Sequence, residues 1–215
     1  MNVARPIAAA AAVAITKTPD ALSAFREPGC AAMVWSRSLR AGLQEWLEQL
    51  APEQLPTARV IVRPDQIRQA AAEVCDASGT PDSEERAMLI DDIDQLAQHF
   101  ASVMQTPYLQ LRLDVITNNA CRKFHVDAVT ARLVCTYRGT GTQYGIATAD
   151  GQPTDIATIT TGSPILLRGT LWPEHPRSGL LHRSPPIEGT GETRLLLVLD
   201  PVTDPSEHPS RWHTN

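Results

Sequence analysis

Short strand-like segments fill the C-terminal part of the chain, from Tyr108 to Asp200. The first, Y-L-Q-L-R-L-D-V-I-T, alternates apolar and polar residues, which is the pattern of a half-buried strand. Glycine and proline turns separate the segments, which we place at 108–117, 123–126, 131–137, 143–146, 156–159, 165–168, 179–181 and 194–200. A run of short strands of this kind predicts an antiparallel sandwich or barrel.

The residues before Pro107 have a mainly helical pattern, although 31–35 and 58–62 are strand-like. The longest predicted helix covers 81–104, with Thr80 as its N-cap and Pro81 at its first position. We therefore expect a single domain of the α+β class. Its predicted parts are a mainly helical support region (1–107), a β core (108–200) and a polar tail (201–215).

Composition and charge exclude several classes of protein. The net charge of -5 and the isoelectric point near 5.7 argue against a nucleic-acid-binding surface, and no apolar run is long enough to cross a membrane. The alanine-rich start lacks the basic region and cleavage site of a signal peptide, so we expect a frayed or packed N-terminus. The four cysteines include no C-x-x-C pair, which favours reduced thiols in a cytoplasmic protein.

The candidate site begins with His125-Val126-Asp127. In an extended segment His125 and Asp127 project from one face and can chelate a divalent metal. His182, which follows two leucines, would add a second imidazole and complete a two-histidine, one-carboxylate triad. Arg194 opens the last predicted strand and could bind a carboxylate through its planar fork.

Each of these residues also has a purely structural interpretation. His125 and Asp127 could form an ion pair, and His182 could be a core histidine. Arg194 could pair with a protein carboxylate such as Asp114 or Glu192. The ordered set on a strand-rich half favours a metal site over these separate explanations.

The motifs in this order resemble a known family. H-x-D is followed by R-L-V-C-T-Y, G-x-x-x-L-L-R-G, L-H and G-x-x-R-L-L-L-V-L. This order is similar to the double-stranded β-helix, a jelly-roll or cupin-like fold, of Fe(II)- and 2-oxoglutarate-dependent oxygenases of the prolyl-hydroxylase type. The F-H-x-D and H-R-S-P-P blocks also resemble an uncharacterised bacterial family of unknown function. The resemblance covers about residues 108–200.

The resemblance implies roles for individual residues. His125, Asp127 and His182 would hold iron, Arg194 would bind the far carboxylate of 2-oxoglutarate, and Tyr137 would assist it. From the strand pattern we expect Leu133, Cys135 and Tyr137 to face the site. The segment 139–142, G-T-G-T, only approximates the family's usual loop.

Three functions follow from these residues. The first is an Fe(II)/2-oxoglutarate-dependent dioxygenase of the hydroxylase type. The second is a cupin-like protein that binds zinc or another divalent ion in metal homeostasis, and the third is a hydrolase with a metal-bound water. The sequence leaves open the substrate, a small molecule or a peptide, and the oligomeric state.

Overall fold

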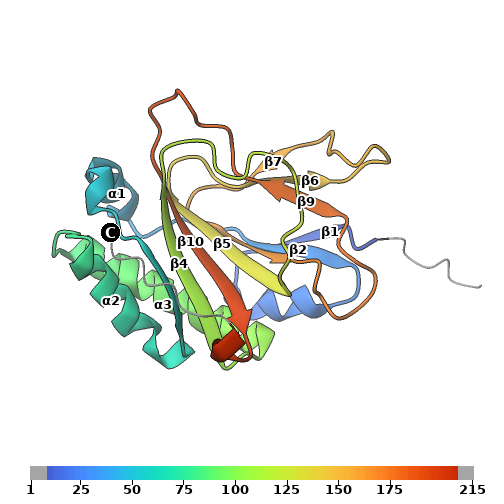
Figure 1. Ribbon diagram of the computed structural model, residues 1–215, viewed down its shortest axis with the longest axis horizontal. Helices are drawn as coiled ribbons and strands as arrows, with labels where there is room; N and C mark the ends of the chain where they lie inside the picture. Colours follow the sequence, from blue (N-terminus) through green and yellow to red (C-terminus); the bar gives the residue numbers. More distant parts are fainter. Residues whose placement is uncertain (1–8, 208–215) are drawn as a thin grey trace, which may run out of the picture.

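A computed structural model describes residues 9–207 (Figure 1). The strands are β1 (Ala12–Thr16), β2 (Cys30–Trp35), β3 (Ala58–Val62), β4 (Tyr108–Ile116), β5 (Ala131–Arg138), β6 (Gln143–Ile146), β7 (Ala157–Thr158), β8 (Pro164–Arg168), β9 (Leu180–Arg183) and β10 (Arg194–Val202). The α-helices are α1 (Leu43–Gln49), α2 (Ile67–Ala77) and α3 (Glu84–Met104). Short 3-10 helices occupy η1 (Pro19–Arg26), η2 (Pro52–Gln54), η3 (Pro64–Gln66) and η4 (Pro205–Glu207). The expected frayed start and loose tail lie partly outside the described residues.

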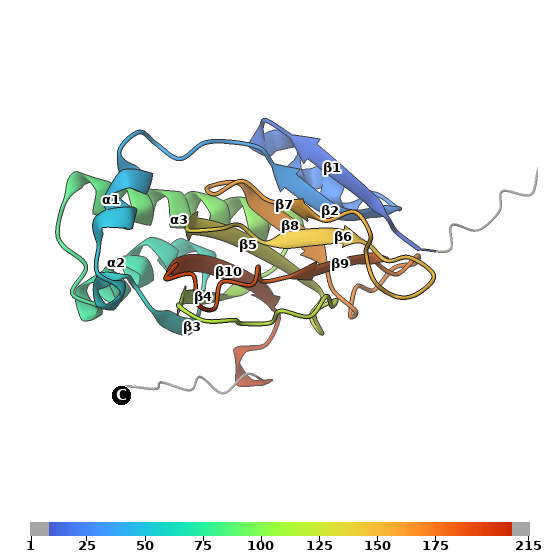
Figure 2. The ribbon, with the colours of Figure 1, turned by 90° about the horizontal axis from the view of Figure 1, so that it is seen from above.

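The strands form two sheets that pack against each other (Figures 1 and 2). The large sheet has the order β1-β2-β8-β5-β10-β4-β3, and the small sheet has the order β7-β6-β9. β1 and β2 run parallel, and the other paired strands run antiparallel. Buried residues of both sheets, including Val134, Val198 and Leu180, form one apolar cluster between them. Two facing sheets of this kind are the arrangement expected of a jelly roll.

The N-terminal half contains the three α-helices of the described residues, and it also contributes three strands to the large sheet. β1 and β2 extend one edge of the large sheet, while β3 forms the opposite edge beside β4. The 3-10 helix η1 covers residues 19–26 and precedes β2. β2 has all six residues buried, so it shows no alternation by which its place in the sheet could be recognised. The strand-like segments predicted at 31–35 and 58–62 thus belong to the large sheet, and the N-terminal half is more than a helical support.

The helices cover one face of the large sheet (Figures 1 and 2). α3 begins at Glu84, where the side chain of Ser83 accepts a hydrogen bond from the backbone of Arg86. The start lies after Thr80 and Pro81, because Ser83 is the residue that caps the helix. Its apolar stripe, which includes Ile93 and Phe100, packs with residues of β4, β5 and β10 in the main core. Among the described residues no helix has the length and apolar character needed to cross a bilayer.

Candidate metal centre

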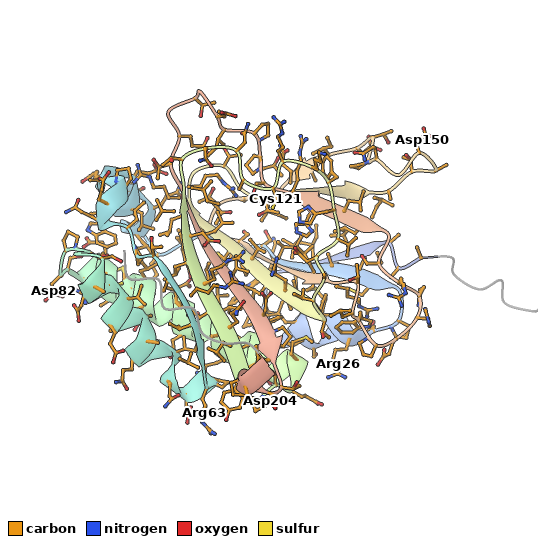
Figure 3. All side chains as sticks on the ribbon, in the orientation of Figure 1. Arg26, Arg63, Asp82, Cys121, Asp150 and Asp204 are labelled. Carbon is orange, nitrogen blue, oxygen red and sulfur yellow. The ribbon has the colours of Figure 1, made fainter. Side chains whose placement is uncertain are left out.

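One loop carries two of the predicted metal ligands. Residues 117–130 connect β4 to β5 and cross between the two sheets (Figure 1); Cys121, labelled in Figure 3, lies in this loop. The backbones of His125 and His182 exchange two hydrogen bonds of 3.0 Å, which join the loop to β9. The carbonyl of Asp127 accepts from the backbone of Thr170 at 2.9 Å. Backbone hydrogen bonds thus attach this loop to β9 and to the turn that follows β8.

A glycine at the end of β8 allows the close approach of this loop. A Cβ added to Gly169 would lie 1.8 Å from the carbonyl oxygen of Val129 and 2.9 Å from that of Asp127. Any larger residue at position 169 would push the loop away from the sheet. Gly169 therefore helps to set the position of the Asp127 backbone.

The structure brings His125, Asp127 and His182 together. Their candidate ligand atoms all lie within 4.8 Å of one another. His125 Nε2 is 3.4 Å from Asp127 Oδ1, and His182 Nε2 is 3.0 Å from Asp127 Oδ2. His125 Nδ1 lies 2.8 Å from the carbonyl oxygen of Lys123 and donates to it, so a neutral ring keeps its lone pair on Nε2. This leaves the ring nitrogen nearer the carboxylate available to a metal.

Asp127 is charged but not fully satisfied by hydrogen bonds. Burial acts to raise its pKa, but His182, Arg132 and His125 outweigh burial and hold the pKa of Asp127 well below its usual range. Oδ2 is buried and accepts no hydrogen bond from the described residues, although His182 Nε2 is close. A buried carboxylate oxygen without a donor is costly unless a cation completes its environment.

Arg132 positions the Asp127 carboxylate, a role that our sequence analysis missed. Its Nη1 lies 2.8 Å from Asp127 Oδ1, while its Nε and Nη2 donate to the two oxygens of Asp200 at 2.7 Å each. Arg132 is on β5 and Asp200 is on β10, so the pairing depends on how those strands are arranged. The sequence shows that an arginine lies on the strand after H-x-D. It does not show that this arginine pairs with Asp200, and that pairing is what directs its Nη1 toward Asp127.

A cavity of about 300 Å³ opens beside the three candidate ligands. Its wall includes His125, Asp127 and His182, together with apolar side chains of the central strands such as Val134 and Val198. Arg59 and Arg112 also line it, and neither was singled out from the sequence. The cavity has the size of a site for a small molecule.

Arg194 is fully buried at the start of β10. It pairs with Ile116 of β4 and lies on the same face of β10 as Leu196. Ile116 and Leu196 line the cavity, but Arg194 does not. Nε donates to the carbonyl of Thr140 at 2.6 Å, but Nη1 and Nη2 have no hydrogen-bond partner among the described residues. Burial lowers the pKa of Arg194 to about 10, against the raising effect of Glu192.

The carboxylates expected to compete for Arg194 are engaged elsewhere. Glu192 accepts from the backbone nitrogen of Thr140 at 2.6 Å and from its hydroxyl at 2.9 Å. Asp114 lies 2.8 Å from Arg112. Gly139, at φ 77°, makes room for this arrangement, because a Cβ there would lie 2.9 Å from Arg194 Cγ. Arg194 is left as a buried cation whose two terminal nitrogens have no partner among residues 9–207.

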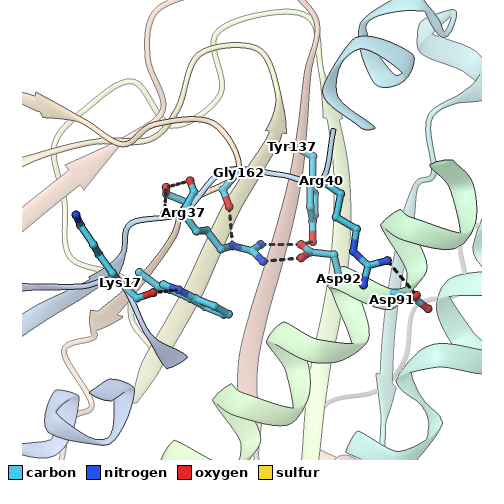
Figure 4. Close-up of polar contacts among 9 residues, drawn as sticks. Lys17, Arg37, Arg40, Asp91, Asp92, Tyr137 and Gly162 are labelled. Atoms are coloured by element: carbon cyan, nitrogen blue, oxygen red, sulfur yellow. Dashed lines mark hydrogen bonds and ion pairs between the residues drawn. The ribbon is translucent and has the colours of Figure 1, made fainter. Parts of the chain in front are cut away.

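Tyr137 does not belong to this site. It lies on the helix-facing side of β5 with Leu133 and Cys135, and its hydroxyl donates to Asp92 Oδ2 of α3 at 2.6 Å (Figure 4). Arg37 binds the same carboxylate with two nitrogens, at 2.5 and 2.7 Å. The expectation that the Tyr137 side faces the cavity was wrong, because β5 is buried on both faces and its sequence shows no alternation.

Replacing Tyr137 with phenylalanine should destabilise the fold by about 1 to 2 kcal/mol, since it removes a buried hydrogen bond to a charged group. Chemical denaturation measures this change, with Tyr108→Phe as the control, because the Tyr108 side chain makes no such bond to the described residues. Metal and 2-oxoglutarate binding should be unchanged in Tyr137→Phe. If Tyr137→Phe instead weakened the binding of metal or 2-oxoglutarate and left the stability unchanged, Tyr137 would belong to the binding site.

Comparisons with known proteins support the fold. The family described as "Protein of unknown function (DUF1826)" matches residues 16–200. The dioxygenase for auxin oxidation 1 from Arabidopsis thaliana, solved with 2-oxoglutarate, superposes with a TM-score of 0.55 at 9% identity, covering 95% of this chain and 100% of that chain. The rice dioxygenase for auxin oxidation gives a TM-score of 0.50 at 12% identity, with 94% and 89% covered.

A prolyl-4-hydroxylase from Pseudomonas putida gives a lower TM-score of 0.37 at 17% identity, with 75% of this chain and 92% of that chain covered. No curated protein matches the chain in sequence. The chain therefore resembles 2-oxoglutarate oxygenases in its fold, and the resemblance indicated by its motifs is confirmed.

Proposed function

This chain belongs to the DUF1826 family of proteins of unknown function, and we propose that it is an Fe(II)- and 2-oxoglutarate-dependent oxygenase of the hydroxylase type. The observation that carries the proposal is Arg194. Two terminal nitrogens of this buried guanidinium have no partner among the described residues, and its strand also lines the cavity beside the three candidate ligands; such a group is suited to binding an anion. A protein that only stores or senses a metal has no need of such a cation.

The three candidate ligands suit a divalent metal of this class. Two imidazoles and one carboxylate leave adjacent coordination positions open on an octahedral ion, as non-haem Fe(II) chemistry requires. The donor-free Oδ2 of Asp127 supports the fit, because a cation would satisfy it. Arg132 would keep the carboxylate in place from the other side.

Arg194 suits the second group, 2-oxoglutarate. Its Nη1 and Nη2 offer a fork to a carboxylate, and its Nε bond to Thr140 fixes the guanidinium plane. A dicarboxylate could then reach from Arg194 toward the three ligands. The Arabidopsis thaliana dioxygenase, which was solved with 2-oxoglutarate, supports this proposal through its similar fold.

When bound, iron and 2-oxoglutarate would supply the oxidation: O₂ and 2-oxoglutarate yield succinate and CO₂, and one oxygen atom enters a C–H bond of the substrate. The chain contributes binding and orientation. His125, Asp127 and His182 would hold the metal, and Arg194 would set the direction of the cosubstrate. Apolar residues of β5 and β10, including Val134 and Val198, limit the access of water.

The test is turnover of 2-oxoglutarate by protein loaded anaerobically with Fe(II) and then exposed to O₂. We expect slow formation of succinate even without a substrate, and none when Fe(II) is replaced by Zn(II). Binding of 2-oxoglutarate to the Mn(II) form should be measured in parallel by calorimetry. A protein that binds metal normally, yet neither binds nor consumes 2-oxoglutarate, would instead be a cupin-like metal-binding protein.

A further inference from the structure

Two arginines lie directly opposite each other in the wall of the cavity. Arg59 of β3 pairs with Arg112 of β4, and both line the cavity beside the three candidate ligands. Like charges at directly opposed positions of antiparallel strands destabilise a sheet. The pairing is more unexpected in a chain whose net charge is -5.

The nearby carboxylates do not neutralise both arginines. Arg112 Nε lies 2.8 Å from Asp114 Oδ2, without the geometry of a hydrogen bond. Arg59 donates only to the neutral side chain of Gln110, at 3.4 Å, and no carboxylate of residues 9–207 lies within ion-pair distance of it. The pair therefore carries a surplus positive charge at the cavity. Arg59 Nη1 and both terminal nitrogens of Arg112 have no partner among residues 9–207, and the long bond from Arg59 Nη2 to Gln110 involves a neutral acceptor.

The position of the pair separates it from Arg194. Val134, Val198, Arg112 and Arg59 form one row across β5, β10, β4 and β3. Neighbouring strands lie about 4.8 Å apart, so Arg112 is about 10 Å across the sheet from β5, the strand that carries Arg132. Arg194 lies instead along β10, four residues before Val198, at a distance of about 13 Å. A cosubstrate held by Arg194 would leave the arginine pair free.

We propose that Arg59 and Arg112 bind an oxyanion, a carboxylate or a phosphate, of a small-molecule substrate whose other end reaches the three candidate ligands. This inference rests on the proposed oxygenase function and adds the class of substrate. A volume of about 300 Å³ is in the range of small-molecule sites. An anion between the two guanidinium groups would also remove their mutual repulsion.

The test uses three probes that share a six-carbon chain: hexanoate, hexyl phosphate and the uncharged hexanamide. Binding to the Mn(II) form saturated with 2-oxoglutarate is measured by calorimetry and by the broadening of probe resonances near Mn(II). We expect one or both anions to bind at least about tenfold more tightly than hexanamide. Whichever anion binds more tightly identifies the head group.

The decisive variant is Arg59→Gln/Arg112→Gln, which should lose this preference while it keeps 2-oxoglutarate binding. The control is Arg63→Gln/Arg68→Gln, which makes the same change of net charge at exposed positions outside the cavity wall. The proposal is overturned by equal binding of hexanamide, by no binding of either anion, or by an anion preference that survives in the double variant.

The two proposals can fail separately. If the wild-type protein does not bind 2-oxoglutarate, the proposed function fails, and the probes are then measured on the Mn(II) form alone. If 2-oxoglutarate binds and the anions do not, only the substrate inference fails.

Discussion

Replacing His182 with alanine should weaken Mn(II) or Fe(II) binding by more than about 100-fold, since changes to groups that merely support metal ligands already cost 10- to 100-fold. The His182 side chain is 9% exposed and lies 3.0 Å from Asp127, so solvent cannot readily replace its nitrogen. The loss of one imidazole leaves two candidate ligands, His125 and Asp127, which both lie in the loop between β4 and β5. Anaerobic competition against a metal-binding dye measures the affinity.

The matched control is His175→Ala, which removes an exposed histidine outside the cluster. Its metal affinity should equal that of the wild type. His182→Gln, which preserves much of the side-chain volume, separates loss of a ligand from a packing defect. Unchanged metal affinity in a folded His182→Ala protein would show that the three residues form a structural ion-pair cluster.

Arg194→Met should weaken 2-oxoglutarate binding by about 30-fold, which corresponds to about 2 kcal/mol for a charged hydrogen-bonded contact. The same substitution should leave the stability of the ligand-free protein unchanged or raise it. Arg194 is buried with two unpaired nitrogens, and an apolar residue of similar length would relieve that cost. Calorimetry measures binding, and thermal unfolding with and without 2-oxoglutarate measures both stabilities.

Arg168 provides a matched control for this experiment. It is also buried with unpaired nitrogens, but its guanidinium lies 4.3 Å from the ring of Trp172 on the helix side of the sheet. Arg168→Met should therefore leave 2-oxoglutarate binding unchanged. If Arg194→Met instead unfolds the protein and Arg194→Lys binds 2-oxoglutarate as well as the wild type, Arg194 has a structural role.

Much of the candidate site could be predicted because its signal is local. His125 and Asp127 are two residues apart, and the order of His182 and Arg194 after them matches a family pattern. The strand 108–116 and the buried stripe of α3 could be found for the same reason, since each has one buried face and a clear period.

The sequence by itself determined which residues are candidates for a metal site and the outline of the β core. The tertiary structure alone decided that Tyr137 faces α3, that Arg132 bridges Asp127 and Asp200, and that Arg59 opposes Arg112. Central strands buried on both faces have no alternation that shows which side chains meet the cavity. Pairings between distant strands follow from sheet order and register, which the local pattern of residues does not contain.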